Sequence, residues 1–148
     1  MSADPFRLSR FVDAQASAYE AALAELKRGR KTSHWIWFVF PQIAGLGFSQ
    51  TSQFYAIGSL DEARAYLDHP ILGPRLGACV ATVLNHRGRS AREIFGTPDD
   101  MKFCSSMTLF AHAAPDEPLF RQALEAFFAG ERDPLTLQRL AGEYPRDG

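Results

Sequence analysis

The sequence has few of the patterns by which an activity is ordinarily recognised. Only two of its 148 residues are cysteines, Cys79 and Cys104, and they stand in neither a CxxC nor a Cys/His metal spacing. The phosphate-binding patterns GxGxxG and GxxxxGKS/T, the zinc motif HExxH and the nucleophile motif GxSxG are all absent. We therefore expect no metal ion and no cofactor, and the sequence leaves any catalytic residue unknown.

No segment has the composition of a membrane span or a secretion signal. The first residues, MSADPFRLSR, lack the apolar centre of a signal peptide, and no apolar run approaches the ~18 residues of a transmembrane helix. We expect a cytoplasmic protein that does not enter a membrane and whose thiols stay reduced. Lys and Arg number 16 against 17 Asp and Glu, so the net charge of −1 disfavours nucleic acid as a partner.

Apolar residues, in contrast, are plentiful. Hydrophobic residues make up 46% of the chain, including 12 phenylalanines, which predicts a well-filled core and excludes a disordered chain. The length is typical of one domain, and no linker, internal repeat or low-complexity segment divides it. We expect a single domain over residues 1–148.

Helix-start signals recur along the chain. Proline follows a capping side chain at Asp4, Thr97 and Asp133, while Ser59 and Ser90 begin capping boxes of the form SxxE. Between these signals the apolar residues follow the 3.6-residue period of a helix, and clean period-two alternation is missing. The sequence predicts an all-α protein, a compact domain of roughly seven or eight short to medium helices.

One segment, Gly29–Gln42, combines cations, aromatic rings and an amide. From His34 to Phe40 it is apolar on every side, so periodicity cannot separate a buried strand from a buried helix, although Ser33 as a cap and the lack of partner strands favour a short central helix. The segment is either such a buried helix with basic neighbours or the wall of a pocket. In the second interpretation the cations would bind a phosphate or carboxylate, the rings would stack on a planar ligand, and the amide would recognise a base edge. The candidate ligand-binding residues are Arg30, Lys31, His34, Trp35, Trp37 and Gln42.

A second polar set has helical spacing. Lys102, Ser105 and Ser106 fall at i, i+3 and i+4 and so share one helix face. Helical serines usually bond to a preceding carbonyl or to water, so these residues favour a contribution to a polar pocket over a nucleophilic pair. Together with Tyr55 they are expected to close the far side of the site.

Five motifs give the chain a family resemblance that extends over nearly its whole length. They are KxxHWxWFxFPQ from Lys31, YAI from Tyr55, EAxxYL from Glu62, LGxRL from Leu72 and DxKxxSSMTLF from Asp100. The chain resembles the family catalogued as domain of unknown function 1810, whose members are sometimes labelled "calpastatin". The resemblance implies a mainly α-helical single domain and no established activity. A calpain inhibitor of that kind would be long, polar and disordered, unlike this composition.

These observations lead to two functional hypotheses. The first is a pocket for a small anionic ligand, nucleotide-like or otherwise phosphorylated, with His34 as the one candidate acid–base near neutral pH. The second is a protein-interaction or homo-oligomerising module without catalysis, with the aromatic residues of Phe48–Phe54 exposed. An enclosed Trp37 and Gln42 would favour the first, and a flat aromatic surface the second. The sequence leaves catalysis and oligomeric state open.

Overall fold

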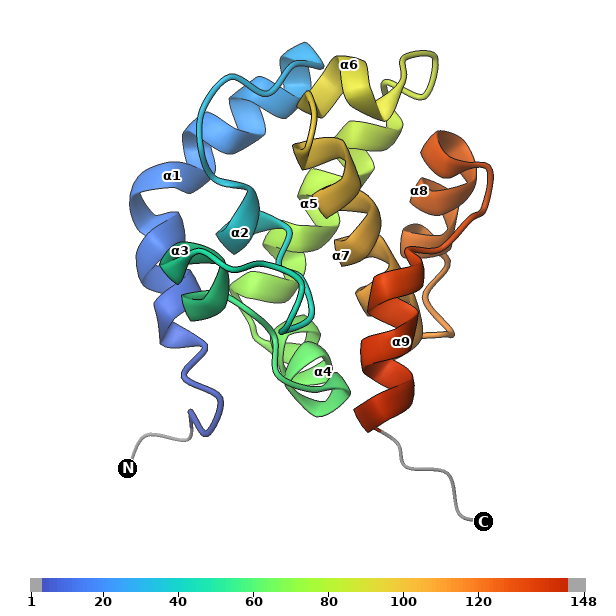
Figure 1. Cartoon of the computed structure of the whole chain (residues 1–148). Helices are drawn as coiled ribbons and strands as arrows, with labels where there is room; N and C mark the ends of the chain where they lie inside the picture. The colour runs from blue at the N-terminus through green and yellow to red at the C-terminus, as the bar shows by residue number, and fades with distance from the viewer. Residues whose placement is uncertain (1–3, 144–148) are drawn as a thin grey trace.

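The computed structural model describes residues 4–143, and within them the chain forms nine helices around one core (Figure 1). Their bounds are α1 (Ser9–Arg28), α2 (Ile36–Val39), α3 (Gln50–Phe54), α4 (Leu60–Asp68), α5 (Leu72–Leu84), α6 (Ala91–Phe95), α7 (Asp99–Ala113), α8 (Pro118–Phe128) and α9 (Pro134–Glu143). The only β-type pairing in this part of the chain is an isolated parallel bridge between Ile43 and Ile57. The predicted all-α class is confirmed, with short helices making the number slightly larger than expected.

Two helices, α5 and α7, form the centre of the domain. Helix α5 packs against α1, α4 and α8, and α7 packs against α2, α4, α6, α8 and α9 (Figure 1). Nine of the fifteen residues of α7 are buried, which explains why its sequence is apolar or small on nearly every side. The short α2 lies against α1 and α7, so the apolar end of the segment of mixed cations and aromatic rings is held at the centre of the fold.

Several helix starts follow the predicted capping chemistry. Ser90 and Glu93 form a complete capping box at α6, and the Asp133 side chain accepts a hydrogen bond from the Thr136 amide at the start of α9. Three starts differ from the prediction. At α4 the Ser59 hydroxyl accepts from the Glu62 amide as predicted, but the Glu62 carboxylate accepts from the Gly58 amide, so the capping box is incomplete. Helix α1 begins at Ser9 instead of Pro5, because Arg7 has a positive φ of 52° that interrupts a right-handed helix. The Asp4 carboxylate accepts hydrogen bonds from the amides of Leu8 and Ser9. Helix α7 begins at Asp99, one residue after the predicted proline.

Aromatic rings fill the core beside α2. The ring of Phe103 lies 4.9 Å from that of Phe40 and 4.6 Å from that of Phe95, measured between centroids. Trp35 is also buried, with a tilted contact to Phe40. None of the described helices is long and apolar enough to span a bilayer.

Candidate functional site

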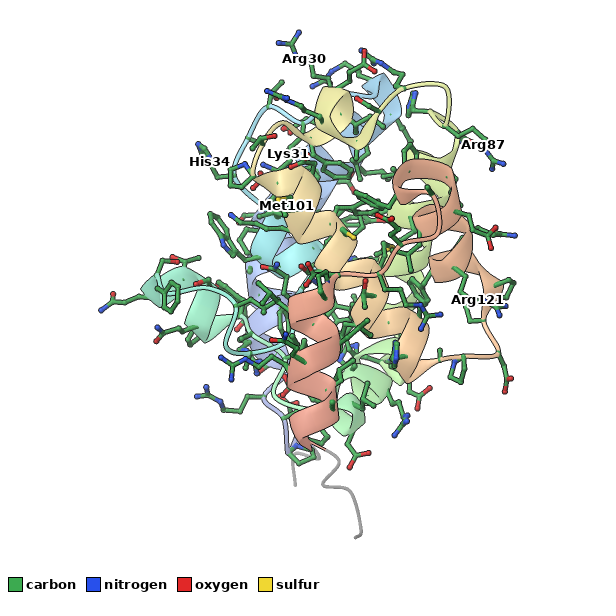
Figure 2. The ribbon with its side chains drawn as sticks, turned by 45° about the vertical axis from the view of Figure 1, so that its right-hand side comes forward. Arg30, Lys31, His34, Arg87, Met101 and Arg121 are labelled. Carbon is green, nitrogen blue, oxygen red and sulfur yellow. The ribbon has the colours of Figure 1, made fainter. Side chains whose placement is uncertain are left out.

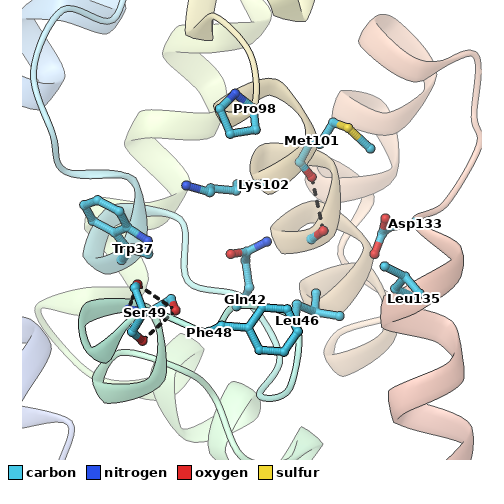
Figure 3. Close-up of a pocket in the computed structure, with 13 residues that line it drawn as sticks. Trp37, Gln42, Leu46, Phe48, Ser49, Pro98, Met101, Lys102, Asp133 and Leu135 are labelled. Carbon is cyan, nitrogen blue, oxygen red and sulfur yellow. Dashed lines mark hydrogen bonds between the residues drawn. The ribbon is translucent and has the colours of Figure 1, made fainter.

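A hollow of about 360 Å³ opens between α2, the loop of residues 43–49, the first turns of α7 and the start of α9 (Figure 3). We call it the Trp37 pocket. A volume of this size matches that of small-molecule sites. Its lining residues are Trp37, Gln42, Leu46, Gly47, Phe48, Ser49, Ser52, Pro98, Met101, Lys102, Ser105, Asp133 and Leu135.

Four of the candidate residues meet in this pocket, namely Trp37, Gln42, Lys102 and Ser105. The Lys102 ammonium lies 5.0 Å from the centroid of the Trp37 ring, within the range of a cation–π contact. Gln42 is half-buried, and its amide has no hydrogen-bond partner among residues 4–143, so both its donor and its acceptor are available to a ligand. The Ser105 hydroxyl instead donates to the Met101 carbonyl at 3.1 Å, as helical serines commonly do.

Lys31 lies beside the pocket but not in its lining. Its Nζ atom is 2.7 Å from Oδ2 of Asp99, and the Lys102 Nζ atom is 3.3 Å from Oδ1 of the same carboxylate. Lys31 also donates to the Ser33 carbonyl and lies over the Trp35 ring, so its ammonium is already surrounded by partners. Two ammonium groups on one carboxylate leave this cluster with a surplus positive charge, and the more accessible of the two is that of Lys102.

Trp35 belongs to the core. Its indole Nε1 donates to Oε1 of the buried Glu25 at 2.9 Å, and the amides of Thr32 and Ser33 donate to the same oxygen. Burial by itself would raise the pKa of Glu25, but the hydrogen bonds from Ser33, Thr32 and Trp35 outweigh it and lower that pKa from 4.5 to about 2. This ionised carboxylate fixes the segment that leads into α2.

The remaining candidates lie apart from the pocket. Arg30 and His34 are exposed and point away from the body of the domain in Figure 2. Tyr55 lines a small adjoining hollow of about 20 Å³ that shares Trp37 and Gln42 with the Trp37 pocket. Ser106 is fully buried on α7, and its hydroxyl has no hydrogen-bond partner among residues 4–143.

Several lining residues were not among the sequence candidates. Phe48, Met101 and Leu135 form an apolar rim and are 89%, 62% and 57% exposed. Phe48 follows Gly47 and was expected only in the exposed aromatic stretch Phe48–Phe54 of the interaction hypothesis, not in the lining of a pocket. Asp133 was interpreted only as a helix cap, although it also lines the pocket.

The loop that carries Phe48 is held by a long-range contact. The Arg139 guanidinium on α9 donates to the carbonyl oxygen of Gly45 at 3.1 Å. Gly45 has φ +96°, and a Cβ atom at this residue would lie 2.5 Å from Cζ of Arg139. The positive φ is what requires glycine here, since the Arg139 side chain could shift to relieve the contact. The hydrogen bond from Arg139 links the loop that carries Leu46 and Phe48 to α9.

The arrangement is suited to binding. The Trp37 pocket offers one ammonium group, one carboxylate, an amide and an aromatic wall, and no histidine is among its lining residues. In the part of the chain that the structure describes, no three His, Cys, Asp or Glu side chains come together as a metal ion would require. These groups can orient a polar, planar molecule by charge, stacking and hydrogen bonding.

Comparison with known proteins places this fold in a family. The sequence model of the family described as protein of unknown function (DUF1810) matches residues 5–140. The conserved hypothetical protein Rv1873 from Mycobacterium tuberculosis, known from a crystal structure, is 52% identical with a TM-score of 0.92, over 93% of this chain and 99% of that one. No curated protein matches the chain. The family resemblance seen in the five motifs is thereby confirmed.

Proposed function

Because the chain belongs to the protein family of unknown function DUF1810, whose description assigns no activity, we propose from the geometry that the Trp37 pocket binds a small anionic ligand. The ligand class is a nucleotide or another phosphorylated metabolite with a planar group. The observation that carries the proposal is the placement of the Lys102 ammonium over the Trp37 ring, beside an unpaired Gln42 amide in a hollow of ligand size.

Each group has a separate role in this proposal. Lys102 attracts the anionic group, because Asp99 compensates only part of the charge of its two lysine neighbours. Trp37 and the exposed Phe48 offer flat surfaces to the planar group, and Gln42 reads its hydrogen-bonding edge. Arg30 and His34 are left out, because neither lines the pocket and both side chains are exposed and point outward from the domain (Figure 2).

The test is a binding screen followed by matched substitutions. Thermal shift and calorimetry would measure binding of nucleoside mono- and diphosphates, ADP-ribose and sugar phosphates. A ligand at ~100 times its dissociation constant raises the free energy of unfolding by ~2.7 kcal/mol. We expect Lys102→Met, Trp37→Phe and Gln42→Ala each to weaken binding by roughly 10-fold, an effect of ~1.4 kcal/mol.

The controls carry the same chemical changes elsewhere on the surface. Lys27 and Gln122 are exposed on α1 and α8, so Lys27→Met and Gln122→Ala should leave the affinity unchanged. A ligand whose affinity survives all three pocket substitutions binds at another place, and the proposal would then be wrong for this pocket.

A second candidate function rests on the rim. Phe48, Met101 and Leu135 form an exposed apolar edge around the pocket mouth, and Phe54 on α3 is 48% exposed. This pattern favours an interaction module or a homo-oligomer, for which such residues would be the contact. Sedimentation of the wild type and of Phe48→Ser distinguishes the two functions. Association that disappears in Phe48→Ser, in a protein that binds no phosphorylated compound, supports the module.

We also propose that the protein acts in the cytoplasm. Cys79 and Cys104 are both free, which accords with a compartment that keeps thiols reduced. Fractionation of cells that produce the protein at its natural level would test this proposal. Recovery outside the cytoplasmic fraction would contradict it.

A further inference from the structure

Asp133 is a buried carboxylate at the edge of the Trp37 pocket. Its residue is 8% exposed, and it precedes the first residue of α9. Its Oδ2 atom accepts hydrogen bonds from the Thr136 amide at 2.9 Å and from the Thr136 hydroxyl at 2.6 Å. The Asp133 amide donates to the Thr108 hydroxyl at 2.9 Å, which joins this helix start to α7. The residue is therefore held in place by two helices.

The second carboxylate oxygen has no such partners. Within residues 4–143 no donor bonds to Oδ1 of Asp133, and no cation forms an ion pair with this side chain. The fully buried side-chain nitrogen and oxygen atoms without a partner among residues 4–143 are Nε of Arg10 and Oγ of Ser106, so Oδ1 of Asp133 reaches the pocket surface and is accessible to a ligand. Capping of α9 explains Oδ2 but leaves the acceptor capacity of Oδ1 unused at a surface that a ligand would contact.

The pocket therefore has a positively charged side chain at one end and a negatively charged one at the other. Figure 3 shows the Lys102 ammonium beside Trp37 on one side and Asp133 beside Leu135 on the other, with Gln42 between them. A ligand that carried only negative charge would gain from Lys102 but be repelled by Asp133. A ligand with an anionic group at one end and N–H donors at the other would satisfy both side chains.

We infer that Asp133 selects the ligand of the Trp37 pocket by accepting hydrogen bonds from an amino group on its planar ring. This inference rests on the proposed function and names its ligand class: phosphorylated compounds whose ring carries an exocyclic amine. The anionic group lies at Lys102, and the amine lies at Oδ1 of Asp133. The Gln42 amide can both donate and accept hydrogen bonds, so it does not distinguish a ring edge with an amino group from one without. The selectivity comes from the Asp133 carboxylate, which can only accept hydrogen bonds.

Two nucleotides provide a matched pair of probes. Guanosine and inosine monophosphates have the same phosphate, sugar and ring system and differ by one exocyclic amino group. A hydrogen bond to a charged acceptor corresponds to roughly 10-fold in affinity, so wild-type protein should bind the guanine nucleotide about 10-fold more tightly. Isothermal titration calorimetry measures both dissociation constants under the same conditions.

Substitution of the carboxylate tests its role directly. Asn and Ser cap helices about as well as Asp, so Asp133→Asn and Asp133→Ser should retain the start of α9. We expect both variants to bind the two nucleotides with equal affinity, while the affinity for the inosine nucleotide stays near the wild-type value. Asp116→Asn, the same change at an exposed residue before α8, should keep the full 10-fold preference. Circular dichroism and thermal unfolding establish that each variant is folded.

The outcomes separate this inference from the function on which it rests. Equal wild-type affinity for the two nucleotides, lost in Lys102→Met, would retain the anion pocket and overturn the role of Asp133. A preference that persists in Asp133→Asn and Asp133→Ser would also overturn it, since another group would then read the amine. Binding of neither nucleotide by the wild type would overturn both proposals for purine nucleotides. A preference abolished only by the Asp133 substitutions establishes the inference.

Discussion

The Nζ atom of Lys31 lies 2.7 Å from Oδ2 of Asp99, and their side chains are only 5% and 18% exposed. This ion pair joins the segment before α2 to the first residue of α7, which are 68 positions apart in the sequence. Because Asp99 also contacts Lys102, the pair fixes the helix turn from which the Lys102 side chain enters the Trp37 pocket. The Asp99 carboxylate thus contributes to the stability of the fold through Lys31 and to the charge of the candidate site through Lys102.

The first prediction concerns removal of that carboxylate. Asp99→Asn leaves the buried Lys31 ammonium without its counter-ion, and breaking a buried pair in this way typically costs 3–5 kcal/mol. Because Asp99 is partly accessible to water, we expect the free energy of unfolding to fall by about 3 kcal/mol. Lys31→Met should cost less, since Asp99 keeps Lys102 as a partner. Urea denaturation at pH 7 measures both changes, and a larger loss in Lys31→Met would contradict the prediction.

The second prediction is a dependence of stability on pH through Glu25. Hydrogen bonds from Ser33, Thr32 and Trp35 lower the pKa of Glu25 from 4.5 to about 2 in the folded protein, against the opposing effect of burial. A depressed carboxyl pKa adds stability that is fully present above the unfolded value of about 4.5. That contribution, up to about 3 kcal/mol, disappears as the pH falls from about 4.5 to about 2.

A substitution isolates the Glu25 contribution from that of other carboxylates. Glu25→Gln should lower the free energy of unfolding at pH 7 and flatten its change between pH 5 and pH 2. Glu20→Gln, on the exposed face of the same helix, should keep the wild-type slope. Urea denaturation across this pH range makes the comparison. Equal slopes in the wild type and Glu25→Gln would show that the carboxyl titrates normally.

The third prediction separates the two tryptophans. Trp35 is buried and donates to Glu25, so Trp35→Phe leaves a small cavity and removes a donor from an ionised acceptor. We expect a loss of about 2 kcal/mol in the free energy of unfolding. Trp37 is half-buried at the pocket, and Trp37→Phe should cost well under 1 kcal/mol. Unfolding followed by circular dichroism compares the variants, and equal losses would count against their different roles.

The fold could be predicted from the sequence because its signals are local. Capping side chains at Ser90 and Asp133 and the helical spacing of apolar residues depend on a few neighbouring positions. Helix α3 was missed, since its sequence QTSQF has no apolar stripe and only the Ser49 cap marks it. A helix this short and polar has no repeating apolar positions from which its 3.6-residue period could be recognised.

The candidate site could be predicted only in part. The segment His34–Phe40 is apolar on every side, so its sequence could not show that Trp35 enters the core while Trp37 faces the pocket. The pairing of Lys31 with Asp99 and the placement of Asp133 beside Leu135 depend on how distant helices pack. Residue types indicated the chemistry of a site, and only the tertiary structure shows which of them share a surface.

The last prediction uses Cys104 to detect the charge of Asp133. Burial, and then the nearby Asp133 carboxylate, raise the pKa of the Cys104 thiol from 9.0 to about 11. Only the thiolate reacts, so at pH 8 alkylation by iodoacetamide should be roughly 100-fold slower than that of an unperturbed thiol. Asp133→Asn removes the repelling charge but not the burial, and it should move the pH–rate profile to lower pH. Cys79, whose pKa burial raises to about 12, should stay unlabelled in Cys104→Ser. An unchanged profile in Asp133→Asn would mean that the carboxylate carries no charge near the thiol, and its role in ligand selection would lose its electrostatic basis.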